Sequence, residues 1–176
     1  ETPSVGIAFV HDGQILLTHH PKSDGFNGTL SIPKGHVEPK DFGLEYFTAI
    51  REVKEEIGIS VPLMWIINEP FRVIQEPNGR EIKYYVVHID KLEWLGMKCS
   101  VVMPTQYQRE EVDWAGFVTF EKAWDYLMPC QRPILEQLGY SRPKNDKEIS
   151  GSQEMSYSEG GQVNSISELL SVDEES

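Results

Sequence analysis

The stretch from Arg51 to Ile59 constrains this chain more than any other part of the sequence. It reads Arg-Glu-Val-Lys-Glu-Glu-Ile-Gly-Ile and brings three carboxylates, those of Glu52, Glu55 and Glu56, into five residues. On an α-helix these positions are three and four residues apart, so the carboxylates fall on roughly one face and repel one another unless a cation balances them. Grouped hard oxygen ligands suit Mg²⁺ or Mn²⁺, which commonly bridge protein carboxylates to phosphates. The stretch therefore predicts a metal-dependent site for phosphate chemistry.

The surrounding residues predict that this stretch lies on an amphipathic helix. Apolar residues recur every three to four positions and would bury one side of the helix: Leu44, Phe47, Ile50, Val53 and Ile57. Gly58 then supplies a left-handed C-terminal cap. Sixteen residues before Arg51, Gly35 closes a Pro-Lys-Gly turn that can hold a metal against the acidic side. A solvated helix face, the alternative for a charge run, would not require that turn.

These residues resemble the Nudix box, whose pattern runs Gly, five residues, Glu, seven residues, and then Arg-Glu-apolar-any-Glu-Glu-any-Gly-apolar. The second half matches at every position from Arg51 to Ile59. The segment from Leu30 to Pro39 is also similar to the one that precedes the helix in Nudix hydrolases of dinucleoside polyphosphates.

The first half of the pattern departs from the family, because two extra residues lie between the halves. Counting forward from Gly35 puts the first acid of the box at Asp41, whereas counting back from Arg51 puts it at Gly43. Glu45 is a third candidate. The position therefore stays unassigned at this point.

The resemblance implies an α/β fold of the Nudix type, an α/β/α sandwich with a mixed β-sheet. It also implies an enzyme that uses Mg²⁺ or Mn²⁺ to hydrolyse a pyrophosphate linkage, with the metal held by Glu52, Glu55, Glu56 and the carbonyl of Gly35. Arg51 would orient a box carboxylate through a bidentate ion pair and so support catalysis.

The general base has two candidates. In the family it is either a box Glu or a Glu on a loop near a later strand, and the Glu110-Glu111 pair stands where such a loop is expected. Glu111 and Glu55 therefore compete for the role, and the choice stays open.

Cationic and polar side chains near the turn are candidates for binding the phosphates of the substrate. Lys34 is the first of them, and Lys22 and His20 precede the turn. A cation here would offset developing negative charge. His36 either contacts phosphate or braces the loop.

Two adjacent tyrosines, Tyr84 and Tyr85, are candidates for stacking on a nucleobase. They lie on a predicted strand and point to opposite faces, so at most one can stack while the other packs.

Hydrophobic patterning predicts strands before and after the box, with two helices near the end of the domain. Asn78-Gly79 is a strong hairpin signal between two of the strands. We expect strands at 4–10, 15–19, 59–67, 71–75, 81–89 and 112–118, and helices at 120–128 and 131–138.

From Lys144 onward the composition changes to Ser, Gly, Glu and Gln. We therefore predict a Nudix domain over residues 1–143 and an acidic tail over 144–176, mostly disordered. The tail contains eight acids and two bases, which is half of the net charge of −12. Ser165 to Glu168 has the form of a capping box before Leu169-Leu170, so the alternatives are a short helix that docks on a protein partner and an ordinary solvated tail.

Charge and cysteine content exclude several classes of protein. The acidity argues against an extended nucleic-acid surface, although a nucleotide bound through a metal remains compatible with it. Cys99 and Cys130 are far apart and form no CxxC motif, so we expect a reducing, cytoplasmic setting. No apolar run approaches the roughly 20 residues that cross a bilayer, and no secretion signal is present, so we expect no membrane association.

A small-molecule nucleotide is the expected substrate, most of all a dinucleoside polyphosphate. The same chemistry could act on RNA 5′ ends, ADP-ribose, nucleoside triphosphates or inositol pyrophosphates. The acidic surface disfavours RNA and inositol pyrophosphates, which would gain from extra Lys or Arg near the site. A non-catalytic nucleotide-sensing module is the alternative of a different class, and it would be expected to have lost some of the metal carboxylates.

Overall fold

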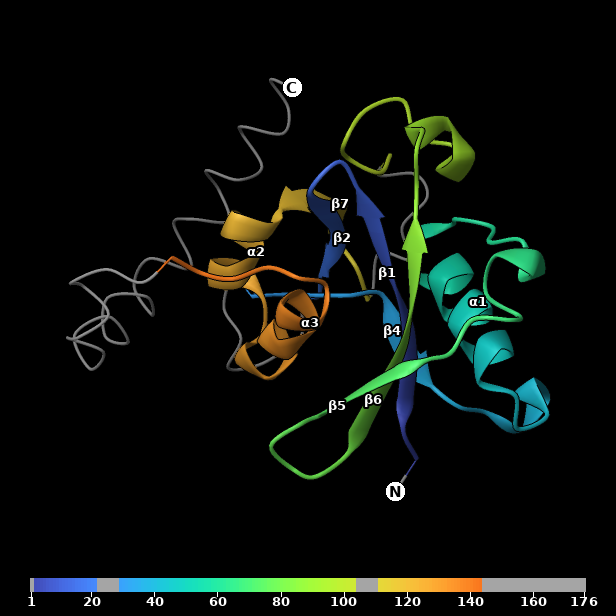
Figure 1. Ribbon diagram of the computed structural model, residues 1–176. Helices are drawn as coiled ribbons and strands as arrows, with labels where there is room; N and C mark the ends of the chain where they lie inside the picture. Colours follow the sequence, from blue (N-terminus) through green and yellow to red (C-terminus); the bar gives the residue numbers. More distant parts are fainter. Residues whose placement is uncertain (1, 22–28, 104–110, 144–176) are drawn as a thin grey trace.

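A mixed β-sheet organises the computed structural model, with helices packed on both of its faces (Figure 1). The structure describes residues 2–21, 29–103 and 111–143. Within these ranges the sheet has seven strands: β1 (Ser4–His11), β2 (Gln14–His19), β3 (Leu30–Ser31), β4 (Lys34–His36), β5 (Arg72–Gln75), β6 (Glu81–His88) and β7 (Trp114–Thr119). The helices are α1 (Glu45–Ile57), α2 (Phe120–Tyr126) and α3 (Arg132–Gln137).

Strand β1 runs through the centre of the sheet and pairs with three other strands. It pairs in parallel with β6 over nearly its whole length, from Ser4–Ile82 to Val10–His88. On its other side the start of β1 pairs antiparallel with β4 and its end with β2. Strand β2 then pairs antiparallel with β7 along its full length. Strand β4, which carries the Lys-Gly part of the Pro-Lys-Gly turn, therefore pairs with β1, and β7 pairs with β2 next to it.

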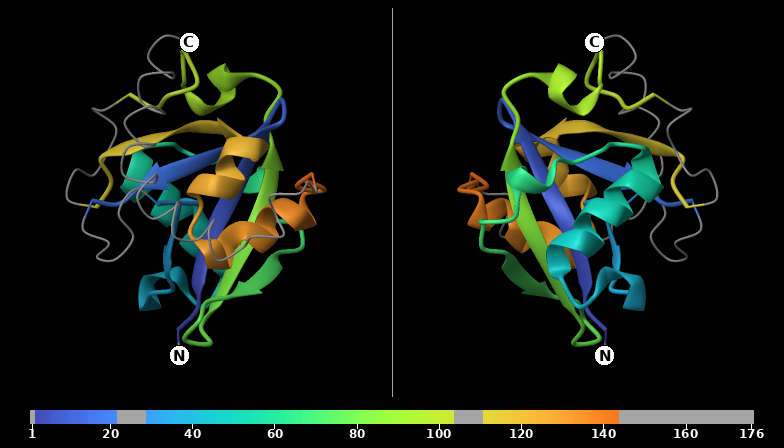
Figure 2. Two further views of the ribbon diagram at one scale, coloured as in Figure 1. Left: turned by 90° about the vertical axis from the view of Figure 1, so that its left-hand side faces the viewer. Right: turned by 90° about the vertical axis from the view of Figure 1, so that its right-hand side faces the viewer.

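Two apolar cores lie on the two faces of the sheet, which confirms the expected α/β/α arrangement. The core under α1 includes Phe9, Val53 and Val112. The core under α2 and α3 includes Ile74 and Leu135. Figure 2 shows α1 and the pair α2 and α3 on opposite sides of the sheet.

Local sequence signals account for most of the turns. The hairpin between β1 and β2 turns at Asp12 and Gly13, both with positive φ, and the hairpin between β5 and β6 turns at Gly79 with φ +88°. Helix α1 ends at Gly58, whose φ of 71° makes the predicted left-handed cap.

Two predictions about secondary structure and packing are wrong. Residues 59–67 form no strand: they make an irregular segment with the 3₁₀ helix η2 (Leu63–Trp65). Their apolar side chains Ile59, Val61 and Ile66 are buried in the core under α1 without pairing with the sheet, so burial alone produced the strand-like composition.

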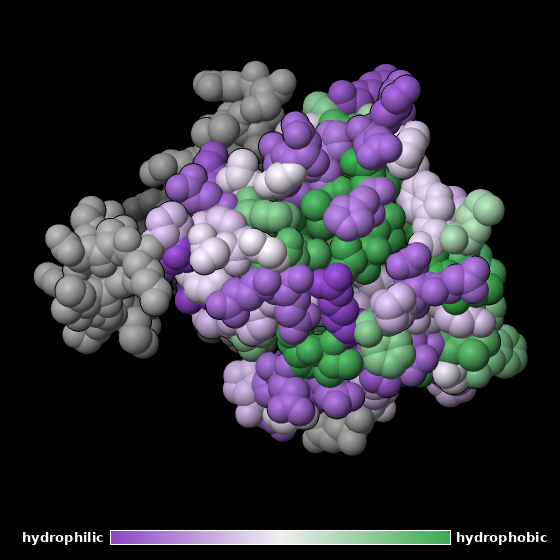
Figure 3. All heavy atoms as spheres, viewed as in Figure 1, coloured by the Kyte–Doolittle hydropathy of each residue, from purple (hydrophilic) through white to green (hydrophobic). Residues whose placement is uncertain are grey.

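The expected apolar stripe of α1 is also only partly buried. Leu44 and Phe47 are 37% and 38% exposed, whereas Glu52 and Glu56 are 8% and 4% exposed. The buried face of the helix is therefore turned toward the acidic residues. Figure 3 shows apolar side chains exposed among polar ones on one face of the molecule, including the part where α1 lies.

No helix within the described ranges is both long enough and apolar enough to span a membrane.

Candidate active site

Helix α1 presses one box carboxylate directly against strand β4. The Glu52 side chain lies so close to Gly35 that a Cβ atom built on Gly35 would come within 1.9 Å of Glu52 Cδ and 2.1 Å of its Oε1. Any side chain at position 35 would displace this carboxylate. The glycine of the turn is therefore required by the approach of α1, and not by a positive φ.

Glu56 is the most deeply buried acid of the box. Its carboxylate accepts a hydrogen bond from the backbone N–H of Lys34, while its Oε1 has no hydrogen-bond partner among the described residues. Burial, and then the charge of Glu52, raise the pKa of Glu56 well above its usual value. Burial also raises the pKa of Glu52, and Arg51 opposes this shift. Two buried, mutually repelling carboxylates with an unpartnered oxygen fit a divalent cation.

Glu55 differs from the other two box acids because it lies at the rim of the site. Its side chain is 41% exposed, with Lys40 Nζ 3.7 Å from Oε2 and Arg51 Nη1 3.2 Å from Oε1. The three carboxylates share one side of α1, as predicted, but at different depths. Within the described ranges, no three His, Cys, Asp or Glu side chains are already gathered as a metal site.

Arg51 is held by a bidentate ion pair with Asp41. Its Nε and Nη2 donate to the two carboxylate oxygens of Asp41 at 2.9 Å each. Asp41 is 2% exposed and accepts further hydrogen bonds from Thr48 Oγ1 (2.7 Å) and from the backbone N–H of Glu38 (2.8 Å). The hydrogen bonds from Arg51, ahead of the other contacts, hold the pKa of Asp41 well below its usual range. Arg51 also donates to Glu52 Oε2 at 2.9 Å and so links Asp41 to the box.

Of the three candidates for the first acid of the box, Asp41 is the one that contacts Arg51. The two extra residues are absorbed by a turn in which Phe42 and Gly43 have φ of 57° and 73°. Gly43 has no side chain to pair. Glu45 instead forms an ion pair with Lys83 on β6, at 3.1 Å.

Glu111 lies close enough to the box for its charge to raise the pKa of both Glu52 and Glu56. It precedes Val112, which is fully buried in the core under α1. This candidate base therefore lies in the segment just before β7, within electrostatic range of the acidic residues. The neighbouring candidate, Glu110, lies outside the described residues.

A group of cationic and polar side chains lies on β4 and beside it, formed by Lys34, His36 and Arg80. Lys34 is near Glu56, and its charge also lowers the pKa of His36, although burial and then Arg80 act more strongly on that imidazole. Arg80 Nη1 donates to His36 Nε2 at 3.3 Å. Arg80 was not identified from the sequence, in which its only local signal is its place after the Asn-Gly turn. Lys22 lies outside the described residues.

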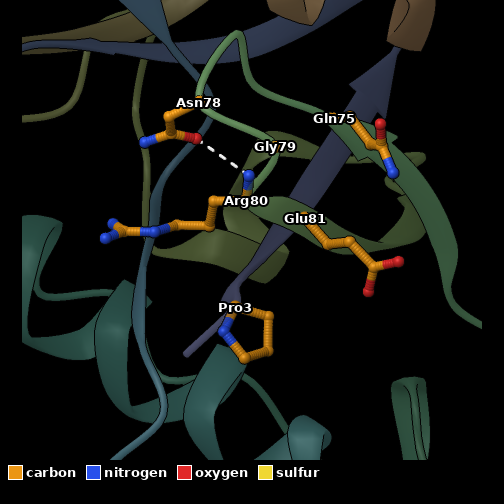
Figure 4. Close-up of a pocket in the computed structure, with 6 residues that line it drawn as sticks. All are labelled: Pro3, Gln75, Asn78, Gly79, Arg80 and Glu81. Atoms are coloured by element: carbon orange, nitrogen blue, oxygen red, sulfur yellow. Dashed lines mark hydrogen bonds between the residues drawn. The ribbon is translucent and has the colours of Figure 1, made fainter. Parts of the chain in front are cut away.

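Arg80 also lines an open pocket at the hairpin between β5 and β6 (Figure 4). Its backbone N–H donates to Asn78 Oδ1 at 2.8 Å, which fixes the turn. In Figure 4 its side chain extends away from Gln75 and Glu81. The negative charge of Glu76 also acts on His36. It raises the pKa of this imidazole, but burial, Arg80 and Lys34 lower it more strongly.

Tyr84 and Tyr85 point to opposite faces of β6, as expected, but both are buried. Tyr84 is 0% exposed and donates a hydrogen bond to the side chain of Gln137, and Tyr85 is 3% exposed with its ring against Phe71 at a centroid distance of 6.2 Å. Burial raises the pKa of Tyr85 to about 12. Neither ring has a face open for stacking in this structure, because each fills one of the two cores.

Several solved structures have a similar fold. The E. coli ORF135 protein has a TM-score of 0.52 and 26% identity, over 82% of this chain and 94% of that one. A C. elegans Ap4A hydrolase has a TM-score of 0.53 and 17% identity, over 77% and 94%. A bifunctional NMN adenylyltransferase/ADP-ribose pyrophosphatase from Francisella tularensis, complexed with AMP and a Mn ion, has a TM-score of 0.54 and 14% identity, over 78% and 41%.

No curated protein sequence matches this chain significantly. The model of the NUDIX domain, however, matches residues 1–138, which is most of the sequence. A box helix that buries its carboxylates against the glycine of β4, on this fold, agrees with that match. The chain therefore belongs to the Nudix family and is a Nudix pyrophosphohydrolase.

Proposed function

We propose that this enzyme uses a divalent metal to cleave a pyrophosphate linkage in a nucleoside diphosphate joined to another group, and that its substrate is a dinucleoside polyphosphate. The observation that carries the proposal is the buried Glu52–Glu56 pair beside Gly35, with Lys34 next to it and His36 and Arg80 beyond. A site that begins with acids and continues with cations suits a metal-bound phosphate at one end and further phosphates at the other.

In this proposal Glu52, Glu55, Glu56 and the carbonyl of Gly35 hold Mg²⁺ or Mn²⁺. The unpartnered Oε1 of Glu56 supports this donor set. When bound, the ion supplies neutralisation of phosphate charge and activation of water. Arg51 keeps Glu52 in place through a 2.9 Å hydrogen bond while Asp41 holds the guanidinium.

Two residues remain candidates for the base that takes the proton from the attacking water. Glu111 is exposed, and its charge acts on Glu52 and Glu56, so it is within range of the reacting groups. Glu55 is also solvent-accessible, but Lys40 and Arg51 both lie within 4 Å of its carboxylate. Both oxygens of Glu55 therefore already face a cation. We therefore assign Glu111 as the base and Glu55 to the metal.

The group formed by Lys34, His36 and Arg80 supports a substrate with more than two phosphates. A planar guanidinium binds phosphate oxygens in pairs, and an ammonium binds them as a point charge. The likeness to the C. elegans Ap4A hydrolase agrees with this choice, although at 17% identity it shows the fold alone. ADP-ribose, with two phosphates, would not extend across the whole group.

The test is Mg²⁺-dependent hydrolysis of a substrate panel by the purified protein. The panel contains diadenosine tetraphosphate, ADP-ribose, a nucleoside triphosphate and a 5′-triphosphorylated RNA. We expect the highest kcat/KM for the tetraphosphate, and loss of nearly all cleavage in Glu52→Gln but not in Glu69→Gln, an exposed acid outside the site. Arg80→Ala should raise KM for the tetraphosphate and leave KM for ADP-ribose unchanged.

Other outcomes would refute separate parts of the proposal. Equal cleavage by wild type and Glu52→Gln would contradict the assigned site. Preference for ADP-ribose or the triphosphate would keep the site and replace the substrate. Nucleotide binding without cleavage of any panel member would leave the sensing module as the better description.

Three further expectations remain proposals. They are a cytoplasmic location, a domain boundary at residue 143 and a protein partner for the tail. The tail itself lies outside the described residues.

A further inference from the structure

Thr48 is a fully buried polar residue in the first turn of α1. Its hydroxyl donates to Asp41 Oδ2 at 2.7 Å, across the connection between β4 and the helix. A hydroxyl in the core costs free energy unless it is hydrogen-bonded, and threonine is a weak helix former. Neither burial nor helix propensity therefore explains a threonine at this position, which leaves the bond to Asp41 as its contribution.

The two carboxylate oxygens of Asp41 accept different numbers of hydrogen bonds. Oδ2 accepts from Thr48 Oγ1 at 2.7 Å, from the backbone N–H of Glu38 at 2.8 Å and from Arg51 Nη2 at 2.9 Å. Oδ1 accepts from Arg51 Nε at 2.9 Å. Thr48 holds the carboxylate from α1, and Glu38 holds it from the start of the 3₁₀ helix η1 (Pro39–Asp41). The guanidinium therefore binds an acceptor that two other donors already orient.

The turn that follows Asp41 is weakly held by packing. Phe42 has a φ of 57° and its side chain is 80% exposed, and Gly43 has a φ of 73°. An exposed ring and a glycine contribute little buried apolar area. The placement of Asp41 therefore depends on its hydrogen bonds, of which the bond from Thr48 is the shortest at 2.7 Å.

Arg51 transmits the placement of Asp41 to the acids of the box. Asp41 binds Nε and Nη2, while Nη1 donates to Glu52 Oε2 at 2.9 Å and to Glu55 Oε1 at 3.2 Å. Nη2 also donates to the carbonyl of His36 in β4 at 2.9 Å. The guanidinium is planar, so fixing one of its edges fixes the direction of its remaining N–H groups.

We infer that Thr48 is a positioning residue for the metal site, which acts through Asp41 and Arg51 to hold Glu52 in place. Hydrogen-bonding partners behind metal ligands contribute to metal affinity, because they fix the orientation of the ligand. A threonine that only fastened the turn to the helix would contribute to stability and not to the affinity for Mg²⁺. This inference rests on the proposed role of Glu52 as a metal ligand.

The experiment measures the affinity for Mg²⁺ alone by titration calorimetry, using full-length wild type, Thr48→Val, Thr48→Ala and Thr48→Ser. Valine keeps the shape of the side chain and removes the donor, alanine removes the donor with less bulk, and serine keeps the donor. We expect the Kd for Mg²⁺ to rise about threefold or more in the valine and alanine variants, below the ~10–100-fold effect of losing a direct partner of a ligand. Thr48→Ser should stay within about twofold of wild type, because the outer hydrogen bond is retained.

Thr119→Val is the matched control, because Thr119 also makes a hydroxyl hydrogen bond at the start of a helix. As the N-cap of α2 it accepts a hydrogen bond from the backbone N–H of Lys122 at 3.2 Å. Loss of this cap should lower the melting temperature by a few degrees. It should leave the Kd for Mg²⁺ unchanged, because Thr119 lies at the end of β7 and outside the chain of contacts from Thr48 to Glu52.

The Mg²⁺ dependence of cleavage gives a second measurement. Loss of the Thr48 hydroxyl weakens the site without removing a ligand. The deficit in kcat/KM of Thr48→Val should therefore be largest at low Mg²⁺ and shrink to within about twofold at saturating Mg²⁺. Adding Thr48→Val to Asp41→Asn should change the Kd by less than about twofold, since both substitutions act on the same chain of contacts.

Separate outcomes overturn the inference and the proposed function. A lower melting temperature with wild-type Kd in both Thr48→Val and Thr48→Ala would overturn the inference, and weaker Mg²⁺ binding by Glu52→Gln in the same series would keep Glu52 as a ligand. A Kd as high in Thr48→Ser as in Thr48→Val would also overturn the inference, because the hydroxyl would not be the cause. Unchanged Mg²⁺ affinity in Glu52→Gln would overturn the proposed metal site, and the inference with it.

Discussion

At the residue scale, the acids of the site oppose the stability of the fold that holds them. Glu56 is 4% exposed, its Oε1 has no partner among the described residues, and the charge that acts on it most strongly is that of another acid, Glu52. Burying a charge without a partner is costly. A protein keeps such a group when the group serves a ligand, which is the situation proposed here for Glu56 and a divalent cation.

Glu56→Gln should therefore stabilise the protein in EDTA and abolish cleavage. The folded-state pKa of Glu56 lies above its unfolded value, so the folded state binds more protons and stability falls as pH rises between the two values. At neutral pH we expect a gain of about 1 kcal/mol or more in the free energy of unfolding, measured by urea denaturation. The gain should shrink near pH 4, where the glutamate is protonated in both states.

With Mg²⁺ bound, wild type should be more stable than Glu56→Gln, the reverse of the order in EDTA. Wild type should gain about 2.7 kcal/mol when Mg²⁺ is at 100 times its Kd, and Glu56→Gln much less. Glu69→Gln, the exposed control, should follow wild type in both conditions. A Glu56→Gln protein that is less stable than wild type in EDTA would contradict this account of the site.

Gly35→Ala should remove activity because the new methyl group would overlap the Glu52 carboxylate. We expect Mg²⁺-dependent kcat/KM to fall at least 100-fold, since a side chain of the site must move. Gly13→Ala is the matched control: its φ of 75° predicts a loss of about 1–2 kcal/mol in stability, but its Cβ would meet nothing within 4 Å. Activity retained in Gly35→Ala would show that Glu52 is free to move without consequence.

At the element scale, the connection between β4 and α1 shows what sequence patterns can and cannot predict. The helix and its Gly58 cap follow from spacing that any helix would impose, but the burial of Glu52 and Glu56 does not, because the apolar stripe predicted their side of the helix to be free. The pairing of Arg51 with Asp41 could not be predicted by counting residues. The two extra residues make the count forward from Gly35 disagree with the count back from Arg51. Only the turn at Phe42 and Gly43 shows where they are absorbed. Arg80 was equally beyond reach, because its partner His36 lies on a different part of the sequence, in β4.

Asp41→Asn should loosen this connection and weaken catalysis indirectly. Removing one member of a buried ion pair leaves Arg51 without its bidentate partner, so we expect a loss of about 3 kcal/mol in the free energy of unfolding at pH 7. The folded-state pKa of Asp41 is depressed, so its contribution is complete above the unfolded value of about 4 and is lost as pH falls below it. The difference between the two proteins should therefore narrow in acid. Glu45→Gln, which affects the separate pair with Lys83, serves as the control and should cost less than about 1 kcal/mol.

At the scale of the whole molecule, all residues proposed for catalysis that the structure describes belong to the part matched by the NUDIX domain model, residues 1–138. The polypeptide ending at residue 143 should therefore keep the kcat/KM and melting temperature of the full chain. Enzyme assays and thermal unfolding of the two lengths, side by side at equal Mg²⁺, measure this. A clear fall in either quantity would assign the acidic tail to the domain rather than to a partner.

The parallel pairing of β1 with β6 has a consequence for synthesis on the ribosome. Ser4 is synthesised well before Ile82, its partner in β6. Strand β2 is likewise synthesised well before its partner β7. Until then the apolar side chains of β1 remain uncovered on a growing nascent chain. Helix α1, which carries the box acids, is translated before strands β6 and β7. The enzyme therefore cannot become active during translation until residues near Thr119 have left the exit tunnel.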